Sequence, residues 1–252
     1  MSAVPEVVVH ADTTVMAHAT AARLLTAVAD AQASRGTASV VLTGGRNGNA
    51  LLAALAEAPA RDAVDWSALD LWWGDERFLP DGDADRNATQ AHEALLDGVG
   101  VDPARVHPMP ASDGAFGADV TAAAAWYARE LAGAAGPEDP SGVPAFDVLL
   151  LGVGPDTHVA SLFPGHAAFA ERSAAAVAVT EAPKPPPTRV SLTVPAIRSA
   201  RQVWLLAAGA DKADAVAAAL AAPADGDVPA AAARGRERTL WLLDRSAAPP
   251  AR

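Results

Sequence analysis

Residues 146–165 read FDVLLLGVGPDTHVASLFPG, a stretch that carries both a structural and a chemical signal. It opens with a nearly continuous apolar run over 146–151, which predicts a buried strand covered by helices on both faces. A Gly-Val-Gly turn follows, and then Asp156 and His158 stand at a predicted helix start. An apolar strand that opens into a polar loop is typical of α/β sheets, which bind ligands at the carboxyl ends of their strands.

The rest of the chain repeats this alternation of short apolar runs with longer alanine-rich stretches, which predicts an α/β fold. We expect a Rossmann-like, mostly parallel sheet with helices on both faces. The predicted strands cover residues 6–10, 39–43, 69–73, 146–151, 174–179, 189–193, 202–207 and 239–243. The predicted helices cover residues 14–33, 48–57, 89–96, 117–132 and 212–221.

Glycine- and proline-rich segments predict surface loops at residues 81–85, 133–144 and 182–187. None of them has the length or the change in composition that would mark a domain boundary. We therefore expect a single domain over residues 1–252.

The composition excludes several classes of protein. Asp and Glu number 30 against 19 Lys and Arg, so the net charge of -11 argues against a nucleic-acid partner. The chain has no cysteine, which excludes disulfides, thiolate nucleophiles and cysteine-ligated zinc. Its histidines lack metal-ligand spacing, so we expect no metal. With neither a signal peptide nor an apolar span of membrane length, a cytoplasmic protein without a membrane partner is expected.

The segment VVLTGGRNGN, residues 40–49, joins a predicted strand to a predicted helix through Gly44 and Gly45. Paired glycines let backbone N–H groups point at an anion, and the positive end of the helix dipole adds to this attraction. Arg46 could strengthen such a site or point to solvent. A tight structural turn explains the glycines equally well.

The segment LDLWWGDERFLP, residues 69–80, places charges directly after an apolar strand. Asp75 and Arg77 would lie where open α/β sheets form their ligand crevice, although a solvated ion pair is an alternative. Trp72 and Trp73 are interpreted as core residues.

His158 is a candidate general base because imidazole titrates near neutral pH and Asp156 could orient it. The alternative is a loop histidine with only a local hydrogen bond. Ser161 does not stand in a GxSxG elbow, which argues against a serine hydrolase. In the segment APKPPPTRVSLT, Lys184 and Arg189 could form a cationic clamp for an anionic substrate, or they could be ordinary solvated charges.

Taken together, these segments resemble the 6-phosphogluconolactonase family, which belongs to a larger group with glucosamine-6-phosphate deaminases. The resemblance runs over nearly the whole chain. In chain order it is carried by LTGGRNGNALL, LWWGDERFLP with DRNATQA, VHPMPASDG, FDVLLLGVGPDTHVASLFPG, PKPPPTRVSLTVPAIRSARQVWLL and GADKADAV.

The resemblance implies a cofactor-free carboxylic ester hydrolase that opens 6-phospho-D-glucono-1,5-lactone in the pentose phosphate pathway. Its sugar-phosphate substrate is the implied partner, and the oligomeric state is left open. The implied catalytic residues are His158, which activates water, Asp156, which holds the imidazole, and Arg77. We expect Arg77 to stabilise the oxyanion, with backbone N–H groups near Gly154 as the alternative. Substrate or phosphate contacts fall on Gly44, Gly45, Arg46, Asp75, Lys184 and Arg189.

Thr157 departs from the family, which usually has glycine between the aspartate and the histidine. If this position requires a positive φ, a β-branched residue is strained there. Two other functions remain open for the chain. One is an amino-sugar phosphate isomerase-deaminase, and the other is a sugar-phosphate-binding protein without catalytic activity.

Overall fold

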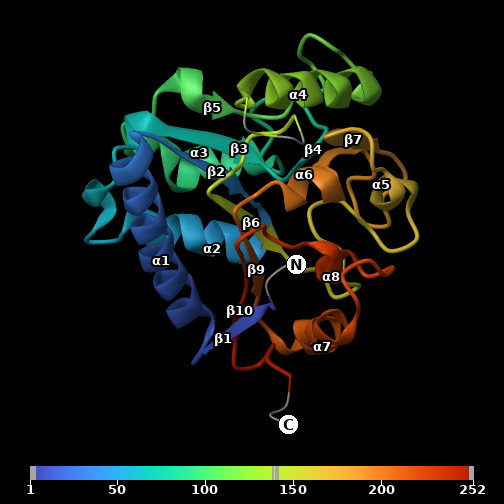
Figure 1. The fold of residues 1–252 in the computed structure, drawn as a ribbon. Helices are drawn as coiled ribbons and strands as arrows, with labels where there is room; N and C mark the ends of the chain where they lie inside the picture. The colour runs from blue at the N-terminus through green and yellow to red at the C-terminus, as the bar shows by residue number, and fades with distance from the viewer. Residues whose placement is uncertain (1–3, 138, 140–141, 250–252) are drawn as a thin grey trace.

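The computed structural model describes residues 4–137, 139 and 142–249. These residues form a seven-stranded sheet in the order β1-β10-β9-β6-β2-β3-β5, with every neighbouring pair parallel (Figure 1). The strands are β1 (Glu6–His10), β2 (Ala38–Leu42), β3 (Leu69–Trp73), β5 (Val106–His107), β6 (Val148–Gly152), β9 (Gln202–Ala207) and β10 (Arg238–Asp244).

Helices lie on both faces of this sheet, as predicted (Figure 1). One group comprises α1 (Thr13–Arg35), α2 (Gly45–Ala56) and α3 (Asn87–Ala94). The other comprises α4 (Val120–Ala134), α6 (Val194–Arg198), α7 (Ala213–Ala221) and the short α5 (Ala167–Ala170) and α8 (Pro229–Ala232). The connections from β1 to β2 and from β2 to β3 run along the sheet toward β5. Those from β6 to β9 and from β9 to β10 run in the opposite direction, toward β1. Because such crossovers are right-handed, the two groups of helices cover opposite faces.

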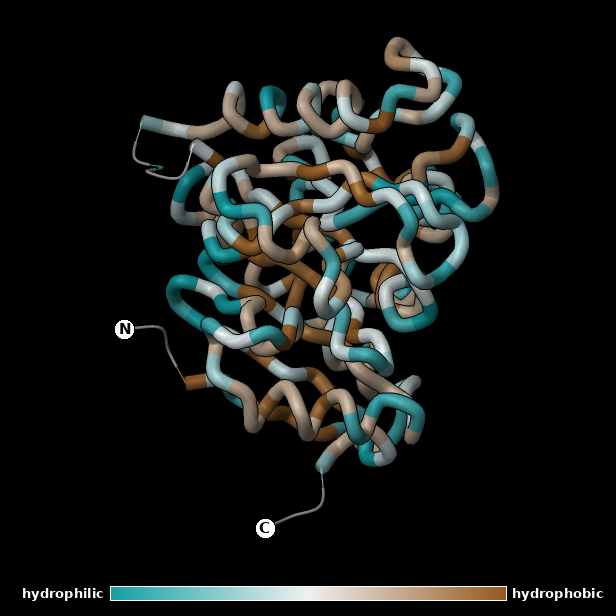
Figure 2. Tube along the Cα trace, turned by 90° about the vertical axis from the view of Figure 1, so that its right-hand side faces the viewer, coloured by the Kyte–Doolittle hydropathy of each residue, from teal (hydrophilic) through white to brown (hydrophobic). Residues whose placement is uncertain are grey.

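The core follows from the continuous apolar strands. Val148, Leu149 and Leu151 in β6 are fully buried, and Trp72 and Trp73 in β3 are buried as predicted. Figure 2 shows the most hydrophobic residues gathered at the centre of the molecule, with polar residues on the outer turns. Burial on both faces explains why these strands read as unbroken apolar runs.

The strands predicted over residues 174–179 and 189–193 form, but they pair outside the main sheet. A three-stranded antiparallel sheet contains β7 (Ala176–Val179), β8 (Arg189–Leu192) and β4 (Asp75–Arg77). The sequence did not predict β4, whose three residues are all charged. Gly74 explains it, because its N–H donates to Leu42 of β2 and its carbonyl accepts from Leu192 of β8. The chain thus passes directly from the main sheet into the small one.

Strand β5 and the short helices α5, α6 and α8 were also not predicted from the sequence. Further differences concern element ends. Helix α2 begins at Gly45, three residues before its predicted start, while α4 begins at Val120, where the Asp119 side chain accepts a hydrogen bond from Ala122. The predicted loop 133–144 includes residues 138, 140 and 141, which lie outside the described residues. A single domain over residues 1–252 stays a prediction. No helix in the described part of the chain is long and apolar enough to cross a membrane.

Candidate active site

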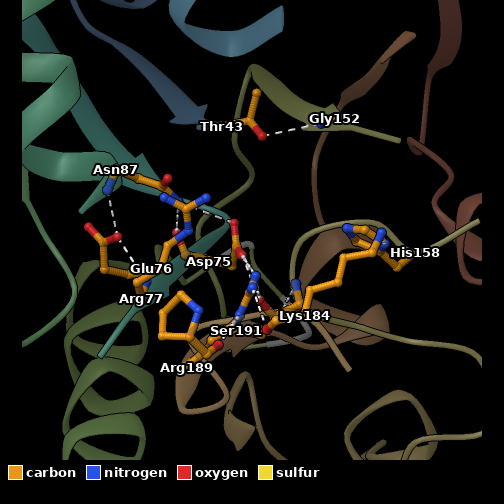
Figure 3. A network of polar contacts seen from close by, with 12 residues as sticks. Thr43, Asp75, Glu76, Arg77, Asn87, Gly152, His158, Lys184, Arg189 and Ser191 are labelled. Carbon is orange, nitrogen blue, oxygen red and sulfur yellow. Dashed lines mark hydrogen bonds and ion pairs between the residues drawn. The ribbon is translucent and has the colours of Figure 1, made fainter. Parts of the chain in front are cut away.

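A cavity of about 350 Å³ opens at the carboxyl ends of β2 and β6. These two strands are neighbours, but the chain continues from β2 to one side of the sheet and from β6 to the other. Such a reversal of strand order leaves a crevice between the two loops, where open α/β proteins bind ligands. The hydroxyl of Thr43 accepts a 3.2 Å hydrogen bond from the Gly152 N–H and so joins the two loops (Figure 3).

One end of the cavity is the glycine loop that leads into α2. Gly45 has φ +74°, a conformation that glycine adopts without strain. Gly44 is the N-cap of α2 and offers no side chain to the first N–H groups of the helix. These donors and the helix dipole are therefore available for an anion. Arg46, also on the cavity wall, is largely exposed and donates to the carbonyl of Ala208 at 2.8 Å.

His158 lies on the cavity wall (Figure 3). Asp156 lies beside it, with 2.5 Å between Nδ1 of the imidazole and Oδ1 of the carboxylate. The His158 ring also packs on Phe163, with 4.6 Å between the ring centroids. The imidazole is mostly buried, whereas the Asp156 carboxylate is partly exposed. The structure thus brings together the predicted base and the carboxylate that would hold it.

Burial and neighbouring charges shift the pKa values of both His158 and Asp156. Burial lowers the pKa of His158 below 6.5, and the partial compensation from Asp156 does not reverse this. Burial alone would raise the pKa of Asp156, but hydrogen bonds from His158 and Lys184 outweigh it and leave the pKa below its usual value. At neutral pH the imidazole is therefore uncharged and the carboxylate ionised. An ionised carboxylate only accepts hydrogen bonds, so Nδ1 carries the proton and Nε2 has the free lone pair.

The predicted helix start at residues 156–158 is wrong, because this segment forms a tight irregular turn. The Gly154 N–H donates to the carbonyl of His158, and the Thr157 N–H donates to the carbonyl of Gly154. A Cβ on Gly154 would lie 2.0 Å from Nδ1 of His158 and 2.5 Å from Oδ1 of Asp156. The glycine therefore makes room for the imidazole and its carboxylate to fold back over the turn.

Asp75 and Arg189 meet in a buried cluster that also includes Ser161, which the sequence did not assign to the site. The Ser161 hydroxyl donates to Asp75 at 2.6 Å and accepts from Arg189 at 3.3 Å. The guanidinium of Arg189 also donates to the backbone carbonyls of Lys184, Pro185 and Pro186. Arg189 therefore fixes the proline-rich loop against β4, and few of its donors remain for a substrate.

Two further residues at the site were missed by sequence reasoning. Glu76 is buried, which raises its pKa, and its carboxylate accepts the backbone N–H groups of Arg77, Asn87 and Ala88. It therefore holds the start of α3 against β4. Lys212 lines the cavity beside the glycine loop and is mostly buried. The motif GADKADAV, in which Lys212 stands just before a helix, is the sequence signal that could have identified this residue.

Comparison with known proteins agrees with this geometry. A family model described as glucosamine-6-phosphate isomerases/6-phosphogluconolactonase matches residues 11–241. The chain belongs to this family. The resemblance that the motifs indicated is thereby confirmed.

Relatives within this family are similar over almost their whole length. The 6-phosphogluconolactonase of Streptomyces coelicolor is 67% identical and aligns over 98% of this chain and 95% of its own. The Mycobacterium tuberculosis 6-phosphogluconolactonase is 52% identical over 94% of each chain. The solved structure of the Trypanosoma brucei 6-phosphogluconolactonase is 30% identical, with a TM-score of 0.83 over 96% of this chain and 97% of that one. A monomeric glucosamine-6-phosphate deaminase, 19% identical with a TM-score of 0.76 over 96% of this chain and 98% of that one, shares the fold.

Thr157 has φ +70°, so the position that usually holds glycine in this family does require left-handed backbone. Its carbonyl accepts a 3.0 Å hydrogen bond from Ala230, which holds the strained peptide in place from α8. Left-handed backbone costs a residue with a Cβ roughly 1–2 kcal/mol, and a glycine at this position would remove that strain. The greater conformational freedom of glycine in the unfolded chain offsets part of this gain in stability.

We expect Thr157→Gly to stabilise the protein by about 0.5–1 kcal/mol, which denaturant unfolding would measure. Thr157→Ala is the matched control, since it removes the branched side chain but keeps the Cβ that strains the backbone. A gain in the alanine variant as large as in the glycine variant would show that the side chain, and not the backbone, is the source of the strain.

Proposed function

We propose that this chain hydrolyses the ring ester of 6-phospho-D-glucono-1,5-lactone to 6-phospho-D-gluconate, a step of the pentose phosphate pathway. The observation that carries the proposal is a neutral imidazole, held by a carboxylate, in the same cavity as a glycine loop suited to phosphate. The family and the names of the similar proteins support the same reaction.

His158 acts as general base in the proposed reaction. Its Nε2 takes a proton from a water molecule, whose oxygen attacks the lactone carbonyl carbon C1. The carbonyl π electrons move to the carbonyl oxygen and form a tetrahedral oxyanion. When the intermediate collapses, the bond between C1 and the ring oxygen breaks, and His158 returns its proton to the leaving ring oxygen. Asp156 accepts from Nδ1 throughout and stabilises the transient imidazolium.

The phosphate would bind at the opposite end of the cavity. Backbone N–H groups of Gly44 and Gly45 at the start of α2 form the anion site, with Arg46 and Lys212 at its rim. Anchoring the phosphate fixes C1 relative to the catalytic water, which lowers the entropic part of the barrier. Arg77 and Asp75 also line the cavity and are proposed to contact the hydroxyl groups of the sugar.

We expect Lys212→Met to raise the KM for the phosphorylated lactone by about tenfold to a hundredfold, because a charge-assisted hydrogen bond contributes about 1.5–3 kcal/mol. Unphosphorylated glucono-1,5-lactone should be hydrolysed equally well by the wild-type protein and by the Lys212→Met variant. Parallel initial rates on the two lactones measure the difference. Equal losses on both substrates would contradict a phosphate contact.

The proposed reaction is tested by acid release from freshly prepared 6-phosphogluconolactone near pH 6.5, with spontaneous opening subtracted. Acceleration by the wild-type protein supports the lactonase. Ammonia release from glucosamine 6-phosphate would instead identify a deaminase, and binding without turnover of either compound would identify a sugar-phosphate-binding protein. A cytoplasmic location and the lack of a nucleic-acid partner remain predictions from the sequence.

A further inference from the structure

Lys184 lies beside the catalytic pair. Its Nζ is 3.1 Å from Oδ1 of Asp156 and 3.3 Å from Nδ1 of His158. Figure 3 shows the Lys184 side chain extending to His158 from the proline-rich loop. Arg189 holds that loop in place by binding the Lys184 carbonyl at 3.0 Å. The loop is therefore anchored through its backbone, and the ion pair with Asp156 holds the ammonium group beside the imidazole.

The other donors considered for the oxyanion are in different positions. The Gly154 N–H already donates to the carbonyl of His158. Arg77 donates to the carbonyl of Asp85 and lies on the far side of Asp75 from His158 in Figure 3. Lys184 alone among these donors contacts the base itself. Lys184 donates one hydrogen bond to Asp156, and the protonated Nδ1 of His158 cannot accept a second, so two of the three N–H donors are left for a ligand in the cavity.

We infer that Lys184 is a catalytic residue whose ammonium group binds the lactone carbonyl oxygen and stabilises its developing negative charge, and that it does not contact the phosphate. This inference rests on the proposed lactone hydrolysis. As water adds to C1, the carbonyl π electrons become a lone pair on that oxygen, next to Nζ of Lys184. The proton from water goes to Nε2 of His158, and Lys184 keeps all of its own protons. Collapse of the intermediate restores the carbonyl and breaks the bond to the ring oxygen.

The same contact ties Lys184 to the titration of His158. The charged groups that face the imidazole are Asp156 from its own loop, Lys184 from the proline-rich loop and Asp75 from β4. Arg189 of β8 lies beyond Phe163, with its guanidinium 5.8 Å from that ring. The ammonium of Lys184 opposes a second positive charge on His158, while the two carboxylates favour it. Removal of Lys184 should therefore raise the pKa of His158.

The experiment compares Lys184→Met with Lys184→Arg, which keeps the positive charge, and with Lys212→Met at the phosphate end. Initial rates are measured between pH 5 and 8 on the phosphorylated lactone and on glucono-1,5-lactone. We expect Lys184→Met to lower kcat by about 10²–10³-fold, and by the same factor on both lactones. The acid limb of its kcat/KM profile should move to higher pH, and Lys184→Arg should keep the limb of the wild type.

Several results would overturn the inference. A rise in KM confined to the phosphorylated lactone, as expected for Lys212→Met, would make Lys184 a phosphate ligand. An unchanged kcat in Lys184→Met would remove Lys184 from catalysis. A wild-type protein that opens neither lactone would refute the proposed function together with this role. NMR titration of His158 tests the contact independently of turnover, since an unchanged pKa in Lys184→Met would show that the ammonium does not act on the base.

Discussion

His158→Ala should lower kcat for lactone hydrolysis by about 10²–10⁴-fold, the range found when a general acid-base residue is lost. The expected loss follows from the geometry, because Nδ1 is committed to Asp156 and Nε2 is the imidazole nitrogen left to act on water. The KM should change little, since the proposed phosphate contacts come from the glycine loop and not from His158. Acid release at saturating lactone measures the effect.

His92→Ala is the control for this experiment. His92 lies in α3, where its ring contacts Asp97 at the surface. Both variants should unfold cooperatively and keep the far-UV circular dichroism of the wild type. Full activity in a folded His158→Ala variant would rule out the proposed base.

The pH dependence of wild-type kcat/KM is a second test of the role of His158. The proposed mechanism requires neutral His158, so kcat/KM should rise with pH through the pKa of this imidazole. Because burial lowers that pKa below 6.5, the rise should be complete by neutral pH. In His158→Ala this limb should be absent.

Gly154→Ala should have the second large effect, lowering kcat by about 10²-fold. The added methyl group would lie 2.0 Å from Nδ1 of His158, closer than any real carbon contact, so the imidazole or the turn must move. A displacement of about 1 Å at a catalytic group is enough for a loss of this size. The pair of His158 and Asp156 should also lose its short hydrogen bond, which NMR of the Nδ1 proton would detect.

Gly133→Ala is the matched control for Gly154→Ala. Gly133 lies in the last turn of α4, and a Cβ there meets nothing within 4 Å. Alanine in a helix is favoured over glycine by about 0.5–1 kcal/mol, so this variant should be as active as the wild type and slightly more stable. If Gly154→Ala behaved in the same way, the imidazole would not depend on the close approach that the turn provides.

An acidic protein that binds an anionic substrate needs a local excess of positive charge. Five of the 19 lysine and arginine residues line the cavity, although the net charge of the chain is -11. These residues are Arg46, Arg77, Lys184, Arg189 and Lys212. Since a cleft focuses the field of its own charges, the acidic outer surface does not prevent attraction of a phosphorylated lactone. The net charge of the chain therefore argues against a nucleic-acid partner, but it does not predict the charge of the ligand that the cavity would bind.

Much of the fold could be predicted from local sequence. Strand β6 is buried on both faces and therefore reads as an unbroken apolar run. Helix α1 lies within a few residues of its predicted limits, with Asp12 accepting from Val15 at its start and left-handed Gly36 at its end. By contrast, β4 is short and charged, and it forms because Gly74 carries the chain onto β8. No local pattern reveals such a pairing.

The sequence by itself determined the order of the longer strands and helices, the family, and the short-range pair of His158 with Asp156, because each is signalled by motifs of residues close together in the chain. Only the tertiary structure decided which distant side chains complete the site. Lys184 reaches His158 across 26 residues, and Ser161 reaches Asp75 across 86. The burial of a strand can be predicted from its own residues, but the role of a charged loop residue depends on the partners that the fold brings to it. Lys184 is therefore a possible phosphate ligand from the sequence, but in the folded protein it lies beside His158, the proposed catalytic base.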